Sequence, residues 1–430
     1  MRQLLAKLLN GGINRRDFAR RMLLAGFGAV TVESILDTVA VAQGQPASTH
    51  EMKFEPFSEH TAFEQWCAGE GIPVYTQFSI PDVRKLELKP WKRLGTSGAI
   101  VNLTGNEATD ATFIFELQAG ARTHAHRYMF EETIFVLDGE GETTVWYDRN
   151  HQQTFKWQKN SLFSPPLNVW RQHQAKSMAK LLSFHDLPIV LDLLHNADFV
   201  FSNDFVFRDR YNNQPGYFVL NPEKFAHYGS AAGFSENEKG EARMVEGGLI
   251  PDINNLKMYE AKKRGARNKT VEVVLSDNTM QTHISEFEVG TYKRAHRHGP
   301  GSQILSLNSI GYTLAWKGSP KYSEARENIR VDWTEGAMFT PPDRWYHQHF
   351  NIGDTPARYM ATSWIGGKFW AKGLGGGGRT HRLNLVKYQD GGNMIDYSDE
   401  DPTVRSMFEE ELKKHGIPLR MPGEKTPKNE

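Results

Sequence analysis

Two short motifs occur twice in this chain, in the same order, and this duplication constrains the fold more than any other feature of the sequence. The segment "RTHAH" (122–126) recurs as "RAHRH" (294–298), and "FSPPLNVWRQH" (163–173) recurs as "FTPPDRWYHQH" (339–349). The copies are 172 residues apart for the first motif, from 122 to 294, and 176 apart for the second, from 163 to 339. Motifs that keep their order at nearly one offset indicate a tandem duplication, so we expect two similar domains.

Each copy has the pattern of a β-rich domain. Runs such as "ATFIFELQAG" and "TIFVLDGEGETTVWY" read as strands broken by glycine turns, and neither copy contains a 15-residue helical period. Short strands with frequent turns predict a barrel or a sandwich. Residues i and i+2 of a strand share a face, so His296 and His298 should point together into the interior, with Arg294 in phase.

The spacing of glycines, histidines, a proline and an asparagine in the second copy resembles the two-motif signature of the cupin family. The matching positions are Gly290, His296, His298, Gly336, Pro342, His347 and Asn351. The sequence departs from the signature at Gln303, where the pattern has Glu, and at Arg344, where it has Gly. The resemblance covers 99–187 and 271–366 and implies two tandem cupin barrels, each a double-stranded β-helix of jelly-roll type.

His296, His298 and His347 are the metal ligands that this pattern predicts. Three imidazoles on neighbouring strands can hold one face of a divalent metal ion and leave the opposite face open. The alternative is that these histidines are solvated or hydrogen-bonded strand residues. His349, in phase with His347, is expected to form hydrogen bonds behind the ligands or to take part in substrate binding. For Gln303 a hydrogen bond to a bound oxygen and simple space filling remain equal alternatives.

The missing carboxylate bears on the chemistry of the site. Three neutral imidazoles leave the full +2 charge on the metal, which favours an anionic chelating substrate with a further position free for dioxygen. Imidazole ligands with open positions suit Fe(II), although Mn, Ni, Cu and Zn are also tolerated.

Two further segments resemble the gentisate 1,2-dioxygenase group of bicupins, which have an all-histidine iron site. They are "RWYHQHFN" (344–351) and the inter-barrel segment "HDLPIVLDLLHNADFVF" (185–201). The resemblance implies a non-haem Fe(II) dioxygenase acting on a hydroxylated aromatic acid, with Arg294 as the candidate for binding the substrate carboxylate. Two rival interpretations are an oxalate-decarboxylase-like bicupin, which calls for three His and one Glu around manganese, and a non-catalytic cupin that binds a small ligand.

The first copy is a weaker candidate for a metal site. It has His124, His126 and either Glu131 or Glu132, but Arg171 stands where the second copy has His347. A guanidinium among the ligands would repel the ion, although His173, which aligns with His349, is in phase and offers a replacement. The alternative is a retired barrel in which Arg122 pairs with Glu131.

The N-terminus predicts export. Arg15 and Arg16 precede Phe18 in "NRRDFAR", an apolar run follows from Met22 to Val32, and "AVA" at 40–42 offers a cleavage site. This order resembles a twin-arginine signal over residues 1–42, which implies a periplasmic or secreted protein exported in the folded state. An ordinary amphipathic N-terminal helix is the alternative.

Charge and composition exclude some partners. Lys+Arg and Asp+Glu both total 51, so no basic surplus exists to bind nucleic acid, and no later segment has the apolar length of a membrane helix. The single cysteine, Cys67, excludes a disulfide framework and cysteine-based zinc sites.

We further expect three segments outside the barrels: an N-terminal arm over 43–98 with a short helix, a linker over 188–270, and a tail over 367–430 with a helix that Asp401 caps and Gly416 ends. Homo-oligomers are expected as in many cupins.

Overall fold

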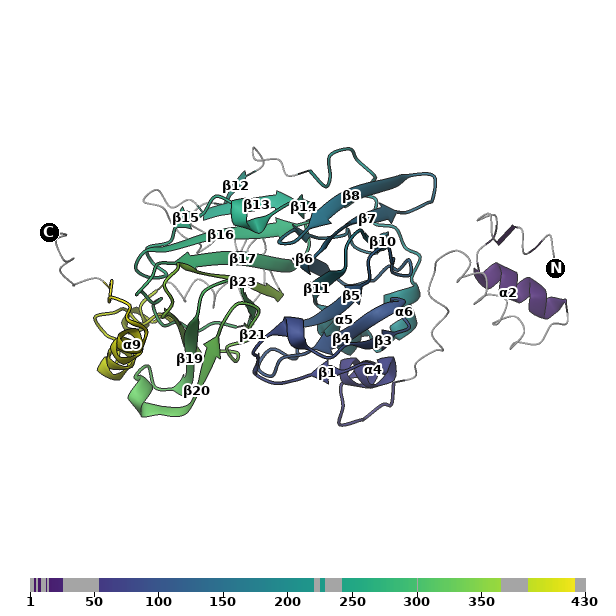
Figure 1. The fold of residues 1–430 in the computed structure, drawn as a ribbon. Helices are drawn as coiled ribbons and strands as arrows, with labels where there is room; N and C mark the ends of the chain where they lie inside the picture. Colours follow the sequence, from purple (N-terminus) through teal and green to yellow (C-terminus); the bar gives the residue numbers. More distant parts are fainter. Residues whose placement is uncertain are drawn as a thin grey trace.

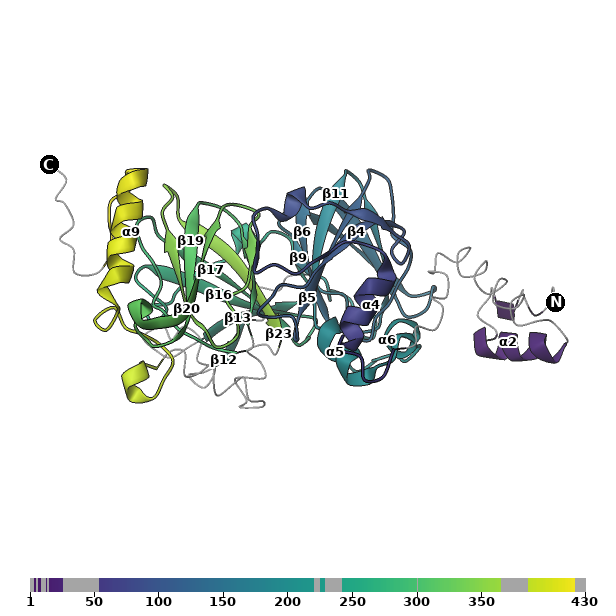
Figure 2. The ribbon, with the colours of Figure 1, turned by 90° about the horizontal axis from the view of Figure 1, so that it is seen from below.

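The fold consists of two β-barrels that lie side by side in a computed structural model (Figures 1 and 2). The structure describes residues 4, 7–8, 13, 15–25, 54–219, 225–228, 242–299, 301–364 and 386–421. The expected cleavage site at 40–42 lies outside these residues. The twin arginines begin helix α2 (Arg15–Leu24). In the described part of the chain, no helix is long and apolar enough to cross a membrane.

The first barrel is built from a larger and a smaller sheet. In spatial order the larger sheet contains β1 (Val74–Tyr75), β4 (Thr96–Val101), β5 (Ala111–Leu117), β11 (Ala179–His185), β6 (Glu132–Asp138), β9 (Leu162–Phe163) and β14 (Leu249–Ile250), with β3 (Lys89–Trp91) beside β4. The smaller sheet contains β10 (Trp170–Ala175), β7 (Glu140–Trp146) and β8 (Gln152–Gln158).

The second barrel repeats this plan. Its larger sheet contains β12 (Phe225–Tyr228), β13 (Ala242–Gly247), β16 (Asn268–Leu275), β17 (Met280–Phe287), β23 (Ala357–Trp364), β18 (Gln303–Ser306), β21 (Met338–Phe339) and β2 (Ser79–Ile80), with β15 (Tyr259–Glu260) beside β16. Its smaller sheet contains β20 (Ala325–Trp333), β19 (Gly311–Gly318) and β22 (Tyr346–Asn351).

The order of the strands is the same in both barrels, and it is that of a jelly roll. The path β5-β11-β6-β9 corresponds to β17-β23-β18-β21, and β10-β7-β8 corresponds to β22-β19-β20. In each barrel the chain alternates between the two sheets, as a double-stranded β-helix requires. The expected fold class, an all-β-dominated pair of tandem jelly-roll barrels, is therefore confirmed.

The two barrels exchange a short strand with each other. β2, from the expected N-terminal arm, pairs with β21 of the second barrel, and β14, from the expected linker, pairs with β9 of the first. These strands begin a further duplicated segment, "SIPDV" (79–83) and "LIPDI" (249–253). In both copies the aspartate side chain accepts a backbone N–H two residues ahead and caps a 3-10 turn, η1 (Val83–Lys85) and η4 (Ile253–Asn255).

An apolar core joins the barrels, and helices cover their outer ends. Side chains from both larger sheets pack in one buried cluster, which includes Ile114, Phe135, Leu182, Ile284, Leu305 and Met360. α4 (Ala62–Glu70), α5 (Leu187–Leu194) and α6 (Ala197–Ser202) lie against the first barrel, and α9 (Pro402–His415) lies against the second (Figures 1 and 2). α4 is the expected short helix, and α9 is the expected terminal helix, with Asp401 as its N-cap and Gly416 in the left-handed conformation at its end.

Candidate metal centre

The three histidines that the sequence singled out meet inside the second barrel. His347 lies on β22, and His296 precedes β18 and forms a two-way backbone bridge with His347, with N–H to O distances of 3.1 and 2.8 Å. The ring centroids of His296 and His347 are 4.4 Å apart, and His298 completes the cluster at 5.6 Å from His296 and 5.0 Å from His347. One ligand nitrogen from each ring lies within 4.8 Å of the other two, a spacing that one metal ion can bridge.

Hydrogen bonds set the tautomers of two of these rings. Nδ1 of His296 lies 3.0 Å from the carbonyl oxygen of Arg294, and Nδ1 of His347 lies 3.1 Å from that of Trp345. Because a carbonyl oxygen only accepts, Nδ1 must carry the proton in both rings. Nε2 therefore keeps its lone pair, which is the arrangement found in metal-ligating histidines whose other nitrogen is held by a backbone carbonyl.

Burial keeps two of the three rings uncharged. His296 and His347 are each 4% exposed, and burial lowers the pKa of both well below the usual range of histidine. Neighbouring histidines lower the pKa of each further. Neutral imidazoles are the form that binds a divalent ion, so the donor set fits a metal at the pH where most proteins operate.

His349 is anchored by a hydrogen bond from the side away from the three ligands. Its Nδ1 lies 2.8 Å from Oγ1 of Thr313, and the same oxygen accepts the indole N–H of Trp333 at 3.1 Å. A hydroxyl oxygen that accepts from the indole can either donate its proton to Nδ1 of His349 or accept a second hydrogen bond from it. In both cases Nδ1 is engaged with Thr313, and Nε2 is the other polar atom of the ring, which lines the cavity. This matches the expected role of His349 beside the ligands better than a role as a ligand.

Charged groups that the sequence analysis did not single out line the same cavity or lie beside it. Nη1 of Arg264 lies 3.2 Å from Nε2 of His296. Nζ of Lys293 donates to Oγ of Ser285 at 2.8 Å and to the hydroxyl of Tyr359 at 2.5 Å. Burial, and then Arg264, lower the pKa of Lys293 well below its usual range. The cavity is small, with about 20 Å³ for the centres of water-sized molecules, enough for about one water.

One carboxyl group accompanies these two basic residues. Glu272 is 2% exposed, and one of its oxygens accepts the side-chain amide of Gln281 at 2.5 Å. Burial raises the pKa of Glu272 to about 7, and Arg264 and Lys293 act against that rise. The guanidinium of Arg264 stays charged when it is buried, and this fixed positive charge makes the interior favourable for an anion.

The structure corrects the placement expected for Arg294. Its guanidinium contacts Asp396 at 3.3 Å and the carbonyl oxygen of Lys262 at 2.7 Å, and it stacks over the ring of Tyr397. It does not line the cavity of the histidines. Residues 292–296 bridge to the smaller sheet without forming a regular strand, so the phase of a continuous strand does not apply to Arg294.

Gln303 also points elsewhere. Its side-chain oxygen accepts the hydroxyl of Thr112 in the first barrel, so this residue belongs to the contact between the barrels. Strand register explains the difference: Ile304 pairs with Phe339, as Ile134 pairs with Phe163 in the first barrel. Counting back from these pairs, Ser302 is the equivalent of Glu132. Ser302 lines the cavity, so a serine stands at the carboxylate position.

Backbone pairing shows that the two copies of the first motif correspond at an offset of 170 and not 172. His126 exchanges backbone hydrogen bonds with Arg171 as His296 does with His347, and Nδ1 of His126 contacts the carbonyl oxygen of His124 as that of His296 contacts Arg294. His126 is thus the equivalent of His296. The positions of His298 and His347 are taken by Tyr128 and Arg171.

The candidate ligands of the first barrel are not brought together. His124 packs against Gly95 outside the barrel interior, and Glu131 forms an ion pair with Arg210. Glu132 is the inward carboxylate, and it forms a buried ion pair with Arg171, Oε1 to Nη2 2.5 Å. In the described residues, the group of His296, His298 and His347 is the only cluster of this kind. The retired barrel is therefore the alternative that the contacts favour, with Arg171 and Glu132 in place of the expected pair of Arg122 and Glu131.

In the interior of the first barrel, apolar side chains occupy positions that carry polar side chains in the second barrel. Register equates Ile100 with Glu272, Phe113 with His283, Phe115 with Ser285 and Leu181 with Tyr359. Leu94 is the equivalent of Arg264, since their carbonyl oxygens accept the backbone N–H of His124 and Arg294. The sequence carried a signal for the polar interior: Gln281, His283 and Ser285 alternate along β17.

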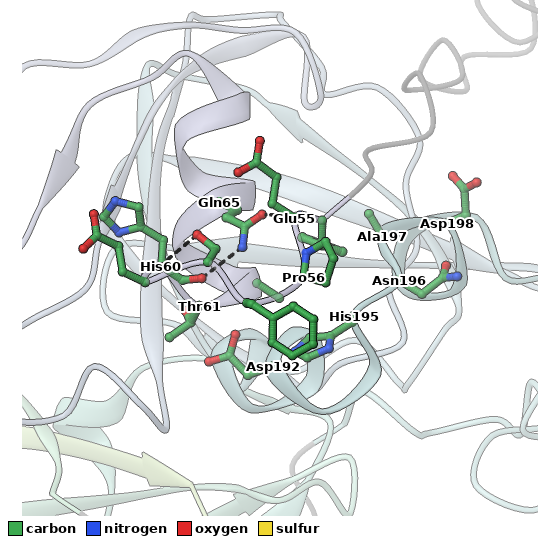
Figure 3. Close-up of a pocket in the computed structure, with 15 residues that line it drawn as sticks. Glu55, Pro56, His60, Thr61, Gln65, Asp192, His195, Asn196, Ala197 and Asp198 are labelled. Carbon is green, nitrogen blue, oxygen red and sulfur yellow. Dashed lines mark hydrogen bonds between the residues drawn. The ribbon is translucent and has the colours of Figure 1, made fainter.

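A larger hollow lies on the outside of the first barrel, where the chain before α4 meets α5 and α6 (Figure 3). Its volume is about 720 Å³, and its lining includes His60, Asp192 and His195. Its polar groups are engaged locally, since the side chain of Gln65 donates to the carbonyl oxygen of His60 and accepts from the backbone of Glu55 (Figure 3). No metal-ligand cluster among the described residues lies there, so the smaller cavity of the second barrel is the candidate site.

Comparisons with known proteins give a likeness of fold. No family model matches the sequence, and no curated protein matches it. Similar solved structures include oxalate decarboxylase from Bacillus subtilis at pH 4.6, at 13% identity and a TM-score of 0.43, covering 67% of this chain and 76% of that one. Another structure of the enzyme, described for its Mn(II) centres, has 14% identity and a TM-score of 0.44, covering 67% of this chain and 78% of that one. The strand order shared by the two barrels defines the fold.

Proposed function

We propose that the second barrel binds one divalent metal ion through His296, His298 and His347, and that the protein is a metal-dependent oxygenase. Iron(II) is the ion that we expect, and the substrate class is a small anionic molecule able to chelate it, such as a hydroxylated aromatic acid. The observation that carries the proposal is the convergence of three ligand nitrogens within 4.8 Å, two of them on rings whose Nδ1 is held by a backbone carbonyl.

The donor set favours this chemistry over that of the rival enzyme class. A serine replaces the carboxylate, so three neutral imidazoles leave the +2 charge of an ion uncompensated, which favours an anionic co-ligand. An oxalate-decarboxylase-like site needs a Glu with the histidines, and neither barrel offers that set. A bound ferrous ion would supply a Lewis-acidic and redox-active centre.

The chain's own residues have separate tasks in this proposal. The three histidines hold the ion, His349 turns its Nε2 toward a bound molecule, and Tyr359, hydrogen-bonded to Lys293, forms part of the cavity wall. The closed interior excludes bulk water, which strengthens each electrostatic contact. Because the cavity has room for about one water, a substrate of several heavy atoms requires the lining to move.

The test is metal content per chain after folding with iron under anaerobic conditions. We expect about one ion in the wild type, none in His347→Ala, and about one in His126→Ala, the matched change at the equivalent of His296 in the first barrel. Oxygen uptake with a panel of hydroxylated aromatic acids then examines the reaction class. Metal retained by His347→Ala but lost from His126→Ala would overturn the assignment, and metal binding without oxygen uptake would favour a non-catalytic binding protein.

A further inference from the structure

Arg264 is the residue of the second barrel whose presence the metal site alone does not explain. It is 8% exposed and comes from the segment between the barrels, ahead of β16. Its equivalent in the first barrel is Leu94, which is 2% exposed and belongs to an apolar core. The fold therefore accepts an apolar side chain at this position. Burying a guanidinium costs free energy that burying a leucine does not. We therefore expect that Arg264 has a specific function at this position.

The contacts of Arg264 place it at the reactive end of the cavity. Nη1 donates to Nε2 of His296, the nitrogen whose lone pair faces the cluster. An anion bound beside the histidines would therefore lie within reach of the same guanidinium. Glu272 is the acid that offsets the charge of Arg264, and Gln281 holds one carboxylate oxygen of Glu272 at 2.5 Å.

The chemistry of that donor identifies a ligand. A guanidinium presents N–H groups in a planar fork that matches a carboxylate, and it stays charged when buried. Because the cavity has room for about one water, a carboxylate reaches this guanidinium only when the lining moves to admit it. The other candidate for this role, Arg294, is engaged with Asp396 and two backbone carbonyls outside the cavity.

We propose that Arg264 is the anion-recognition residue of the site and binds a carboxylate group of the substrate beside the three histidines. This inference rests on the proposed function, since it concerns the same site. A carboxylate is then the substrate group that the site requires, and Arg264, from the segment between the barrels, is the residue that selects it.

The experiment uses the full chain loaded with Co(II), in the wild type, Arg264→Leu, Arg264→Lys and Arg294→Gln. Leucine is the residue that the first barrel has at the equivalent position, and lysine keeps the charge without the fork. Arg294→Gln is the matched control, because its side chain lies outside the cavity. Metal content is measured first, and binding of acetate and of its neutral analogue acetamide is then followed by the visible absorption of Co(II).

We expect about one Co(II) in all four proteins and a loss of acetate affinity of about 10- to 100-fold in Arg264→Leu, the effect of removing a charge-assisted hydrogen bond. Arg264→Lys should fall between, Arg294→Gln should match the wild type, and acetamide binding should be the same in all. Equal acetate affinity in the wild type and Arg264→Leu would overturn the inference while leaving the metal site intact. Loss of Co(II) from Arg264→Leu, with unchanged thermal unfolding, would make Arg264 a support of His296 and also overturn it. A wild type without Co(II) would refute the proposed function, and the anion site with it.

Discussion

Arg171 and Glu132 show how changes at a few residues alter the interior of a barrel. At the position of His347, the first barrel carries a guanidinium that stacks on Tyr128, with 4.3 Å from Cζ to the ring centroid, and pairs with the retained carboxylate. The pair places opposite charges at two positions that correspond to His347 and Ser302 in the second barrel. An internal ion pair thus stands where an ion and its ligands would otherwise be.

This pair gives a stability prediction. Arg171 is 1% exposed and Glu132 3%, so Arg171→Met leaves a buried carboxylate without its counter-charge and should lower the free energy of unfolding by about 3–5 kcal/mol. The double change Arg171→Met with Glu132→Gln removes both charges and should recover most of that loss. Urea unfolding of the wild type, both single variants and the double variant measures the coupling. Strictly additive losses would show that the two charges do not stabilise each other in the folded barrel.

His173 should make the free energy of unfolding depend on pH. Burial, and then Arg171, lower the pKa of His173 to about 3, whereas in the unfolded chain it titrates near the ordinary value of about 6.5. Between these values the unfolded state binds a proton that the folded state does not, so the contribution of His173 to stability is present above pH 6.5 and is lost on acidification. The stability of the wild type relative to His173→Gln should therefore fall by about 2 kcal/mol from pH 7 to pH 5. Urea unfolding at both pH values checks this, and a difference that stays constant or grows would refute it.

At the scale of strands, the sequence predicted the β-rich duplicated fold and the three converging histidines, because periodicity and ligand spacing are local properties. It did not predict the offset of 170 for the first motif. "RTHAH" and "RAHRH" look alike at an offset of 172, but the loop from His126 to Ile134 is two residues longer than the loop from His298 to Ile304. Pairing with β9 and β21 fixes the equivalence, and that pairing is a tertiary property.

The residues around the histidines were missed for a related reason. Arg264 lies in the basic run "KKRGARNK", which reads as an exposed linker, and only its position ahead of β16 brings it to His296. Gln303 was placed by the spacing of the cupin signature and Arg294 by counting along an ideal strand, although neither lies inside a regular strand with the histidines. The alternation of side chains between the two faces of a strand predicts their direction well in the middle of the strand. It predicts their direction less well at irregular strand ends, where functional sites often lie.

At the scale of the whole molecule, the strand exchange ties the two barrels into one cooperative unit. β2, which precedes the first barrel in the chain, is an edge strand of the larger sheet of the second barrel. β14, which precedes the second barrel, is an edge strand of the larger sheet of the first. Ile80 on β2 and Ile250 on β14 are 2% and 0% exposed and belong to the same buried cluster between the barrels. Neither barrel can unfold without exposing apolar surface of the other, so a retired first barrel still supports the second.

We therefore expect one unfolding transition, followed equally by far-ultraviolet circular dichroism, tryptophan fluorescence and, in the loaded protein, metal release. Ile80→Ala and Ile250→Ala should each lower the free energy of unfolding by about 2–5 kcal/mol and shift all three signals together. Leu193→Ala is the control, because Leu193 is 76% exposed on α5 and its truncation should have little effect. If metal release and fluorescence instead separate into two transitions in Ile250→Ala, the barrels unfold independently. In that case the first barrel would not be needed to keep the three histidines together.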